Sequence, residues 1–237
     1  MAIFRAKFYS EVLEIQCNAN VIYPQRSNRS PDVLSEPPAI LYLLHGLSDD
    51  HNAFLDNVPM ERLSHGRNLM IVMAATGRAF YTNQEHGYRY FDFFADELPS
   101  VMSQFFSFSH EREKTFAAGF SMGGYGALKL GLTYPERYGK VAALAPVVCG
   151  KYLVDPGFPE LVHTFGDTLK PGDDLLSLSR KASNRPKIYL SVGTEDELLD
   201  GCRAFENADE YHEIGGAGHT WDYVQDEIPK VLNFLGV

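Results

Sequence analysis

The 237-residue sequence predicts a single α/β domain over residues 1–237, with a mostly parallel central sheet and helices on both of its faces. Two observations predict this fold. First, the chain contains short apolar runs without the polar–apolar alternation of half-exposed strands, as expected for strands that are buried on both faces. These runs are 39–44, 69–75, 115–120, 141–145 and 188–192. Second, helix-like segments lie between the runs, and strands that alternate with helices form parallel sheets.

The pattern of apolar and polar residues changes at residue 39. Before it, residues 2–9 and 11–23 show enough alternation to predict an antiparallel hairpin, and the stretch 24–38, rich in Pro and Ser, predicts a long surface loop. Beyond it, the helical period of apolar residues and the position of Pro135 predict where helices run and where one of them ends. Helices are expected at 97–106, 122–134, 173–182, 198–207 and 221–235, and a last strand at 210–214.

The charge balance and the cysteine content exclude several classes of function. Twenty-one Lys and Arg against 31 Asp and Glu give a net charge of −10, which disfavours nucleic acids and anionic membranes as partners. The cysteines Cys17, Cys149 and Cys202 are too sparse for a disulfide framework, and none has a second ligand at metal-binding spacing. Because the N-terminal segment is charged and no apolar run could cross a bilayer, we expect a cytoplasmic protein without a metal site, either a monomer or a homo-oligomer.

The segment Gly119-Phe120-Ser121-Met122-Gly123 matches the G-x-S-x-G pattern of a nucleophile elbow. It directly follows an apolar run and directly precedes a helix rich in small residues. Such a turn needs glycine on both sides, because the serine backbone is strained and neighbouring Cβ atoms would clash. We therefore expect Ser121 to be a nucleophile at the carboxyl end of a strand, where open α/β sheets place their chemistry.

A serine hydroxyl needs a base that removes its proton as it attacks. His219 is the predicted base, because it follows the glycine-rich turn 215–218 between the last expected strand and the last helix. His212 is the rival candidate, but it falls inside the strand at 210–214, where sheet packing would fix it.

A third group should orient the histidine and stabilise its charged form. Three acidic residues follow the run 188–192, and Asp196, the middle one, is the predicted member. Glu195 and Glu197 remain alternatives. The order of Ser121, Asp196 and the histidine along the chain is that of α/β-hydrolases.

Acyl transfer also requires hydrogen-bond donors for the oxyanion. The backbone N–H of Met122, directly after the nucleophile, is the first predicted donor. The second is the N–H of Leu47, in the segment His45-Gly46-Leu47 after the run 39–44. His45 is expected to support this loop rather than to act as a base.

Together these segments resemble the esterase D branch of the α/β-hydrolases, with the greatest similarity to bacterial tributyrin esterases and a lesser one to S-formylglutathione hydrolases. The resemblance runs from residue 3 to 235. It is carried by Leu43-Leu44-His45-Gly46-Leu47, Tyr81-Thr-Asn, Tyr90, Asp96-Glu97-Leu98-Pro99, the elbow with the residues up to Ala127, Gly193-Thr-Glu-Asp196 and Gly218-His219-Thr-Trp221. It implies a carboxylesterase for short acyl chains, with Ser121, Asp196 and His219 as the triad, Leu47 and Met122 as oxyanion donors, and no metal or organic cofactor.

Two departures from the resemblance bear on the substrate. The stretch from Asp196 to His219 is shorter than usual for this branch, so its helix should be reduced. Residues 147–172 follow no recognisable pattern, although they should cover part of the acyl site. The segment between the expected strands at 141–145 and 188–192 is too short for a large lid, which favours short esters over long lipids.

The expected reaction is hydrolysis of a small-molecule ester through an acyl-enzyme intermediate. S-formylglutathione and acetylated or phenolic plant esters are alternative substrates, and a catalytically silent scaffold used for binding is an alternative of another class. The aromatic residues of 80–81 and 88–94 fit the pocket and the core equally well.

Overall fold

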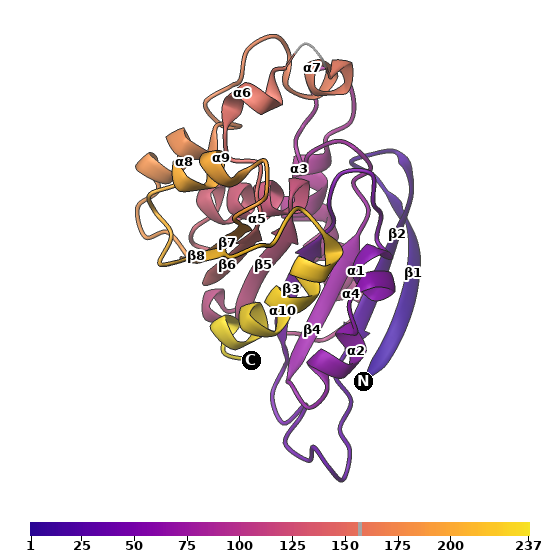
Figure 1. Cartoon of the computed structure of the whole chain (residues 1–237). Helices are drawn as coiled ribbons and strands as arrows, with labels where there is room; N and C mark the ends of the chain where they lie inside the picture. Colours follow the sequence, from indigo (N-terminus) through magenta and orange to yellow (C-terminus); the bar gives the residue numbers. More distant parts are fainter. Residues whose placement is uncertain (156–157) are drawn as a thin grey trace.

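The computed structural model describes residues 1–155 and 158–237 and contains one mixed sheet (Figure 1). Its strands are β1 (Ala2–Ser10), β2 (Ile15–Tyr23), β3 (Ala39–Leu44), β4 (Leu69–Ala74), β5 (Thr115–Phe120), β6 (Lys140–Leu144), β7 (Lys187–Gly193) and β8 (Glu210–Ile214). They lie in the order β1-β2-β4-β3-β5-β6-β7-β8. The hairpin β1–β2 is antiparallel and joins β4 in antiparallel register, whereas all pairs from β4 to β8 are parallel. The predicted fold is confirmed, including the N-terminal hairpin.

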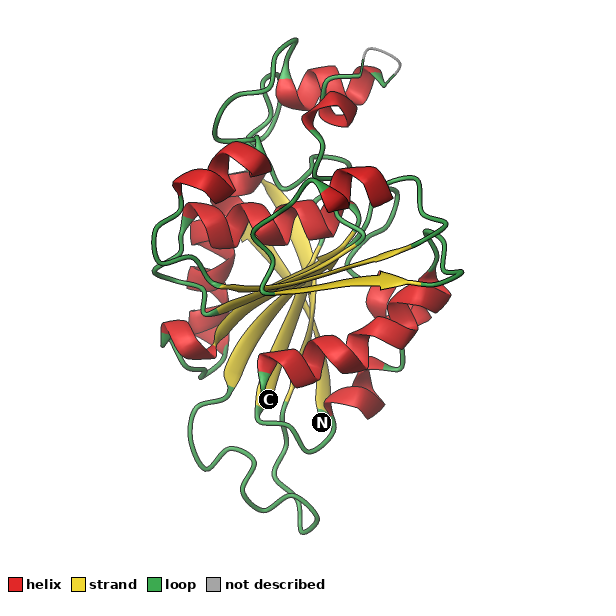
Figure 2. Cartoon of the chain, turned by 60° about the vertical axis from the view of Figure 1, so that its left-hand side comes forward, coloured by secondary structure: helices red, strands yellow, loops and turns green. Residues whose placement is uncertain are grey.

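Helices cover both faces of the sheet, which Figure 2 shows nearly edge-on. The α-helices are α1 (Ala53–Asn57), α2 (Met60–Ser64), α3 (Tyr90–Asp92), α4 (Leu98–Phe105), α5 (Met122–Thr133), α6 (Gly150–Leu153), α7 (Pro159–Phe165), α8 (Leu175–Lys181), α9 (Leu199–Arg203) and α10 (Trp221–Leu235). A π-helical segment, Phe93–Glu97, precedes α4, and a 3₁₀ turn, Arg112–Lys114, precedes β5. Helix α10 packs on one face together with α1 and α2, and α5 packs on the other face (Figures 1 and 2).

Burial explains why the central strands lack alternation. Every residue of β3 and β4 is buried, because helices cover both faces of the sheet there. Helix α5 is buried from Met122 to Leu132, whereas α10 buries a single stripe, as its helical period predicts. The Thr220 hydroxyl accepts a hydrogen bond from the Tyr223 N–H at the start of α10, and the helix ends at Gly236, whose φ of 79° is left-handed.

Four of the five expected helices are shorter in the structure than their patterns predict. The helix expected at 97–106 ends one residue early, and Glu97 belongs to the π-helical turn before it. There the Glu97 carboxylate accepts hydrogen bonds from the N–H groups of Glu11 and Val12, at 2.6 and 3.2 Å, and ties the β1–β2 turn to the body of the protein. The helix expected at 198–207 has only five residues, Leu199–Arg203.

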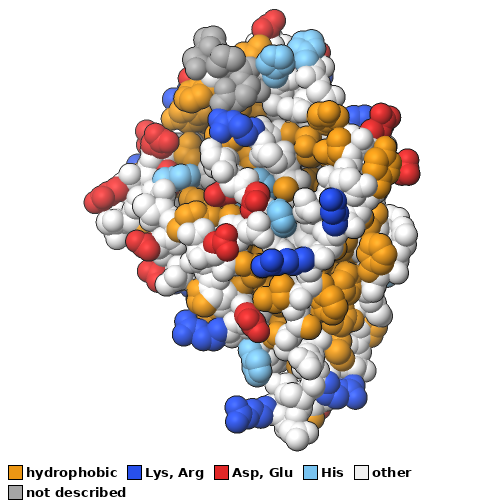
Figure 3. Space-filling model, turned by 90° about the vertical axis from the view of Figure 1, so that its right-hand side faces the viewer, with side chains coloured by type: hydrophobic (Ala, Val, Ile, Leu, Met, Phe, Trp, Pro, Cys, Tyr) orange, Lys and Arg blue, Asp and Glu red, His pale blue; other side chains and the backbone are white. Residues whose placement is uncertain are grey.

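Hydrophobic side chains gather on the face formed by the N-terminal hairpin and the end of α4 (Figure 3). Large exposed side chains there are Ile3, Phe4, Tyr9 and Phe105. The Phe4 and Phe106 rings meet edge to face, with centroids 5.3 Å apart. Across the two described ranges, no helix combines the length and the apolarity that crossing a bilayer requires.

Candidate active site

Ser121 lies between β5 and α5 in a strained backbone conformation, with φ of 58° and ψ of −116°. A non-glycine residue in such a conformation costs about 1–3 kcal/mol and persists only where its surroundings hold it. Here the Ser121 N–H donates to the Leu144 carbonyl at 2.8 Å, and the Ser121 carbonyl accepts from the Tyr125 N–H at 3.0 Å. These bonds to β6 and α5 hold the serine at the carboxyl end of the sheet, as predicted.

The two glycines of the G-x-S-x-G segment are required by close packing. A Cβ on Gly123 would lie 2.0 Å from the Leu44 carbonyl oxygen, and a Cβ on Gly119 would lie 2.3 Å from the carbonyl group of Gly123. Because no side chain fits there, the first turn of α5 presses directly against the end of β3. This contact brings the N–H of Met122 close to the loop that follows β3.

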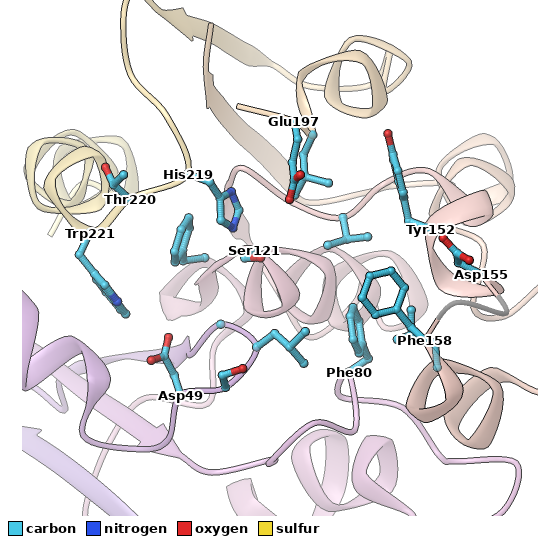
Figure 4. A pocket seen from close by; sticks show the side chains of 17 residues that line it. Asp49, Phe80, Ser121, Tyr152, Asp155, Phe158, Glu197, His219, Thr220 and Trp221 are labelled. Atoms are coloured by element: carbon cyan, nitrogen blue, oxygen red, sulfur yellow. The ribbon is translucent and has the colours of Figure 1, made fainter. Parts of the chain in front are cut away.

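His219 and Asp196 form a hydrogen-bonded pair beside Ser121 (Figure 4). The His219 Nδ1 lies 2.7 Å from Asp196 Oδ2, and the Asp196 side chain is fully buried. The other carboxylate oxygen, Oδ1, accepts from the Leu198 N–H at 2.9 Å. Because Nδ1 faces the carboxylate, Nε2 remains for the serine, which lies next to the imidazole in Figure 4. The Phe120 ring packs on the imidazole with centroids 4.5 Å apart.

The loops that carry the acid and the histidine are joined to each other. The Glu195 N–H donates to the Ala217 carbonyl at 2.9 Å, and the Gly216 N–H donates to the Thr194 hydroxyl at 2.9 Å. A Cβ on Gly193 would lie 2.0 Å from the same Ala217 oxygen. Backbone contacts between the two loops thus set the distance between the carboxylate and the imidazole.

The N–H groups of Leu47 and Met122 have no hydrogen-bond acceptor in the part of the chain that the structure describes. Met122 is the first residue of α5, where helical N–H groups lack partners and the helix dipole favours negative charge. Leu47 lines the same cavity as Ser121. Both backbone donors are thus available at the elbow.

His45 supports the loop that carries Leu47, as expected. Its Nε2 accepts from the Thr76 N–H at 3.1 Å, so Nδ1 carries the proton and donates to the Gly46 carbonyl at 2.8 Å. The Tyr81 hydroxyl donates to the His45 carbonyl at 3.0 Å. Burial lowers the pKa of His45, which favours the neutral ring that this network requires.

The rival candidates lie elsewhere. His212 is on β8, an edge strand, with its side chain 45% exposed and its Nε2 3.6 Å from Glu210. The structure thus places it at the exposed edge of the sheet, although the sequence predicted that packing would fix it. Glu195 is exposed and outside the cavity, whereas Glu197 lines the cavity without contacting the imidazole.

The site opens into a cavity of about 610 Å³ with two different sides. One side is mainly apolar and combines Phe80 with residues of the 147–172 segment (Figure 4). These residues are Val147, Tyr152, Asp155, Phe158 and Leu161. The other side, next to His219, contains Asp49, Thr220 and Trp221. The sequence analysis expected the 147–172 segment to cover part of the acyl site, but it did not identify which residues line the cavity, because the helices there are too short to show a period.

The sequence did not decide whether the aromatic residues of 80–81 and 88–94 line the pocket or belong to the core, and the structure places some of them in each. Phe80 lines the cavity, whereas Tyr81, Phe93 and Phe94 are buried in the core. Tyr88 and Tyr90 line a second hollow of about 280 Å³ beside Arg78 and His163.

Two of the three cysteines are buried. Burial raises the pKa of Cys17 to about 11 and that of Cys202 to about 12, so neither thiol is a ready nucleophile. The three cysteines are free. Within residues 1–155 and 158–237, no three His, Cys, Asp or Glu side chains gather in a way that could hold a metal ion.

The sheet order and the strained serine between β5 and α5 define an α/β-hydrolase fold. The model of the Esterase family matches residues 10–231, and the chain belongs to that family. It is 29% identical to an acetyl esterase from Caldicellulosiruptor saccharolyticus, over 99% of this chain and 98% of that relative.

Two solved structures from Staphylococcus aureus are also similar to the chain, each with 26% identity and coverage of 99% of this chain and 98% of the other. The fluorophosphonate-binding serine hydrolase FphF superimposes with a TM-score of 0.89, and the S-formylglutathione hydrolase FrmB with a TM-score of 0.86. The predictions of an α/β-hydrolase fold and of a serine esterase, a carboxylic ester hydrolase, are therefore confirmed.

Proposed function

We propose that the protein is a carboxylesterase for short-chain acyl esters, with Ser121, Asp196 and His219 as its catalytic triad. The observation that carries the proposal is the 2.7 Å contact between His219 and Asp196 beside the strained Ser121, in a cavity large enough for a small ester. A serine that is exposed to a cavity by its own backbone strain and adjoins an oriented imidazole has the arrangement that activates a hydroxyl for attack.

In the first half of the reaction, Ser121 Oγ attacks the acyl carbon while His219 Nε2 accepts its proton. Asp196 holds the imidazole through Nδ1 and stabilises the imidazolium that forms. The N–H groups of Leu47 and Met122 donate to the developing oxyanion, and each such donor is worth about 2.7–4 kcal/mol in the transition state. His219 then gives its proton to the leaving oxygen, and the acyl group remains on Ser121.

In the second half, water enters on the side that the alcohol has left. His219 Nε2 removes a proton from the water as it attacks the acyl-enzyme, and the same two N–H groups stabilise the second oxyanion. Collapse of this intermediate returns the proton to Ser121 and releases the acid. The atoms and charges balance without a metal or an organic cofactor.

The preference for short acyl chains is supported by the cavity and by one relative. The apolar side of the cavity is formed by Phe80 and by residues of and near the short helices α6 and α7, and the described residues add no large lid to it. The acetyl esterase of Caldicellulosiruptor saccharolyticus acts, by its name, on the shortest of these acyl groups.

The proposal is tested with p-nitrophenyl acetate, butyrate and octanoate, using the wild type, Ser121→Ala and the control Ser103→Ala. Ser103 is an exposed serine of α4, away from the cavity. We expect the acetate and butyrate to be hydrolysed by the wild type and by the control, and not by Ser121→Ala. Activity that survives in Ser121→Ala would exclude this nucleophile, and inactivity of all three proteins would favour a binding scaffold.

Hydrolysis of S-formylglutathione is a second candidate function, supported by the similarity to the hydrolase of Staphylococcus aureus. It uses the same triad and differs only in the leaving group. A kcat/KM for S-formylglutathione above that for every oxygen ester tested would favour it over the carboxylesterase.

We also propose that the chain forms a single domain and works in the cytoplasm. The single domain is supported by one sheet that includes both the first and the last strand. The cytoplasmic location is supported by three cysteines without disulfide partners in the described residues, as reducing compartments favour. Limited proteolysis and fractionation of the native host test these two points.

A further inference from the structure

The position of His219 decides which side of the cavity receives the leaving alcohol. The imidazole must pass its proton to the leaving oxygen, so the alcohol lies on the His219 side of Ser121 and the acyl chain lies on the opposite side. In Figure 4, Asp49, Thr220 and Trp221 are on the His219 side, whereas Phe80 and Phe158 are on the other. The side chains of Asp49 and Trp221 therefore face the leaving group.

Asp49 is a half-buried carboxylate that lacks a partner. Within the described residues, its side chain makes no hydrogen bond and no ion pair, although it lines the cavity. Its Oδ2 lies beside the oxyanion loop, 3.3 Å from where a Cβ on Gly46 would be. Burial and, to a lesser extent, the neighbouring Asp50 raise the pKa of Asp49, as expected for a carboxylate without a positive charge beside it. A positive charge in the cavity would supply that compensation.

Trp221 presents a fixed aromatic ring to the same space. Its indole meets the Phe54 ring edge to face at 5.2 Å, and its centroid lies 5.5 Å from that of Phe120. Tryptophan is the aromatic side chain that attracts cations most strongly, through the negative face of its ring. A carboxylate and an indole on one side of a cavity form the pair of groups that binds a substituted ammonium ion.

Acidic side chains outnumber basic ones among the residues that line the cavity. Asp49 and Glu197 are among them, and so is Asp155, which has a partner of its own, whereas no Lys or Arg of the described residues lines the cavity. The guanidinium of Arg78 donates to the Ser48 hydroxyl at 2.9 Å and is not a lining residue itself. An anionic leaving group would enter this field unfavourably, whereas a cationic one would be attracted.

We propose that the esterase prefers esters whose leaving alcohol carries a substituted ammonium group, held between the Asp49 carboxylate and the Trp221 indole. This inference rests on the proposed esterase function and specifies its substrate class. It also predicts that glutathione, which has more carboxylates than ammonium groups, is a poor leaving group for this enzyme.

The test compares acetylcholine with 3,3-dimethylbutyl acetate, in which a carbon atom replaces the charged nitrogen. We expect the wild-type kcat/KM to be about tenfold higher for the cationic ester. In Asp49→Asn the ratio of kcat/KM for acetylcholine to kcat/KM for the neutral ester should fall to about twofold. This remaining preference is the part that we attribute to the indole. The matched control is Asp56→Asn on α1, which removes the same charge from an exposed position outside the cavity and should keep the wild-type ratio.

A second measurement uses the wild type alone, so it does not depend on whether a variant folds. Tetramethylammonium should inhibit p-nitrophenyl acetate hydrolysis competitively, whereas tert-butanol at the same concentration should not. Equal turnover of the two acetates, or faster turnover of glycerol monoacetate than of the cationic ester, would overturn the inference and leave the esterase function intact. Inactivity of the wild type toward every ester would instead overturn the proposed function.

Discussion

The two walls that enclose Ser121 differ in how the chain builds them. The wall formed by β5, the elbow and α5 is buried from Phe116 to Leu132, and backbone atoms of Leu44, Gly119 and Gly123 are in direct contact. The opposite wall consists of the short helices α6 and α7 and the residue before α7, Phe158, whose side chain is 52% exposed. The first wall fixes atoms by backbone contacts, and the second shapes a surface with side chains. Chemistry thus depends on the rigid wall, and we expect substrate preference to depend on the other.

The largest expected effect separates the two late histidines. His219→Ala should lower kcat/KM for p-nitrophenyl acetate by on the order of 10⁴ or more, because it removes the base that activates Ser121. His212→Ala should change it less than about twofold, since that ring lies at the exposed sheet edge beside Tyr189 and Glu210, away from Ser121. Steady-state kinetics of the two variants measure the difference. A comparable loss in both would contradict the assignment of the base.

The next effect compares glycines from the two regions. Gly123→Ala should reduce the free energy of unfolding by about 3 kcal/mol or more, because its Cβ would overlap the Leu44 carbonyl oxygen. Gly172→Ala, in the 147–172 segment, should change it by less than about 1 kcal/mol, since no atom lies within 4 Å of the added Cβ. Urea unfolding of both variants tests this. A stable Gly123→Ala would mean that α5 does not press on β3.

A smaller effect concerns the side-chain wall itself. Phe158→Ala should lower the ratio of butyrate to acetate turnover by about three- to tenfold, as it removes apolar surface that longer acyl chains would contact. Folding should change little, because the ring is largely exposed. Parallel measurements of kcat/KM on the two esters give the ratio. An unchanged ratio would place the acyl chain away from this wall.

The smallest effect involves the ion pair that joins α9 to β8, near the loops of Asp196 and His219. Hydrogen bonds from the Arg203 guanidinium and the Tyr211 hydroxyl hold the pKa of Glu213 at about 2, below its usual value of 4.5. Since the folded-state pKa is the lower one, the stabilisation is complete above pH 4.5 and is lost as the pH falls toward 2. Arg203→Gln should therefore lower Tm slightly at pH 7 and progressively less in acid. A Tm difference that grows as the pH falls would contradict this.

The sequence predicted the rigid wall because its constraints leave local signals. Gly119 and Gly123 are glycine since any Cβ would clash, and Ser121 is strained, so a short pattern at the end of an apolar run marks them. Asp196 and His219 follow two further strand ends, where the chain order of the fold places them. Choosing Asp196 over Glu195 and Glu197 depended on the resemblance as well as on position.

The side-chain wall and the contacts of Glu97 and Asp49 could not be predicted, because they depend on tertiary contacts that leave no periodic pattern in the local sequence. Helices α6 and α7 have four and seven residues, too few for an apolar period to distinguish them from loops. Glu97 contacts the β1–β2 turn more than 80 residues away, and no local pattern encodes that contact. Asp49 lies just beyond the predicted oxyanion loop, yet only the structure shows that it lines the cavity and that its side chain has no hydrogen-bond or ion-pair partner among the described residues.

The central claim is that Ser121 is a nucleophile activated by the His219–Asp196 pair. Covalent labelling with a fluorophosphonate, followed by intact-mass analysis and peptide mapping, tests it most directly. We predict one label per wild-type chain, located on Ser121, and no label on Ser121→Ala. His219→Ala should be labelled far more slowly because its serine lacks a base. A label on another residue of the wild type, or undiminished labelling of Ser121→Ala, would contradict the account.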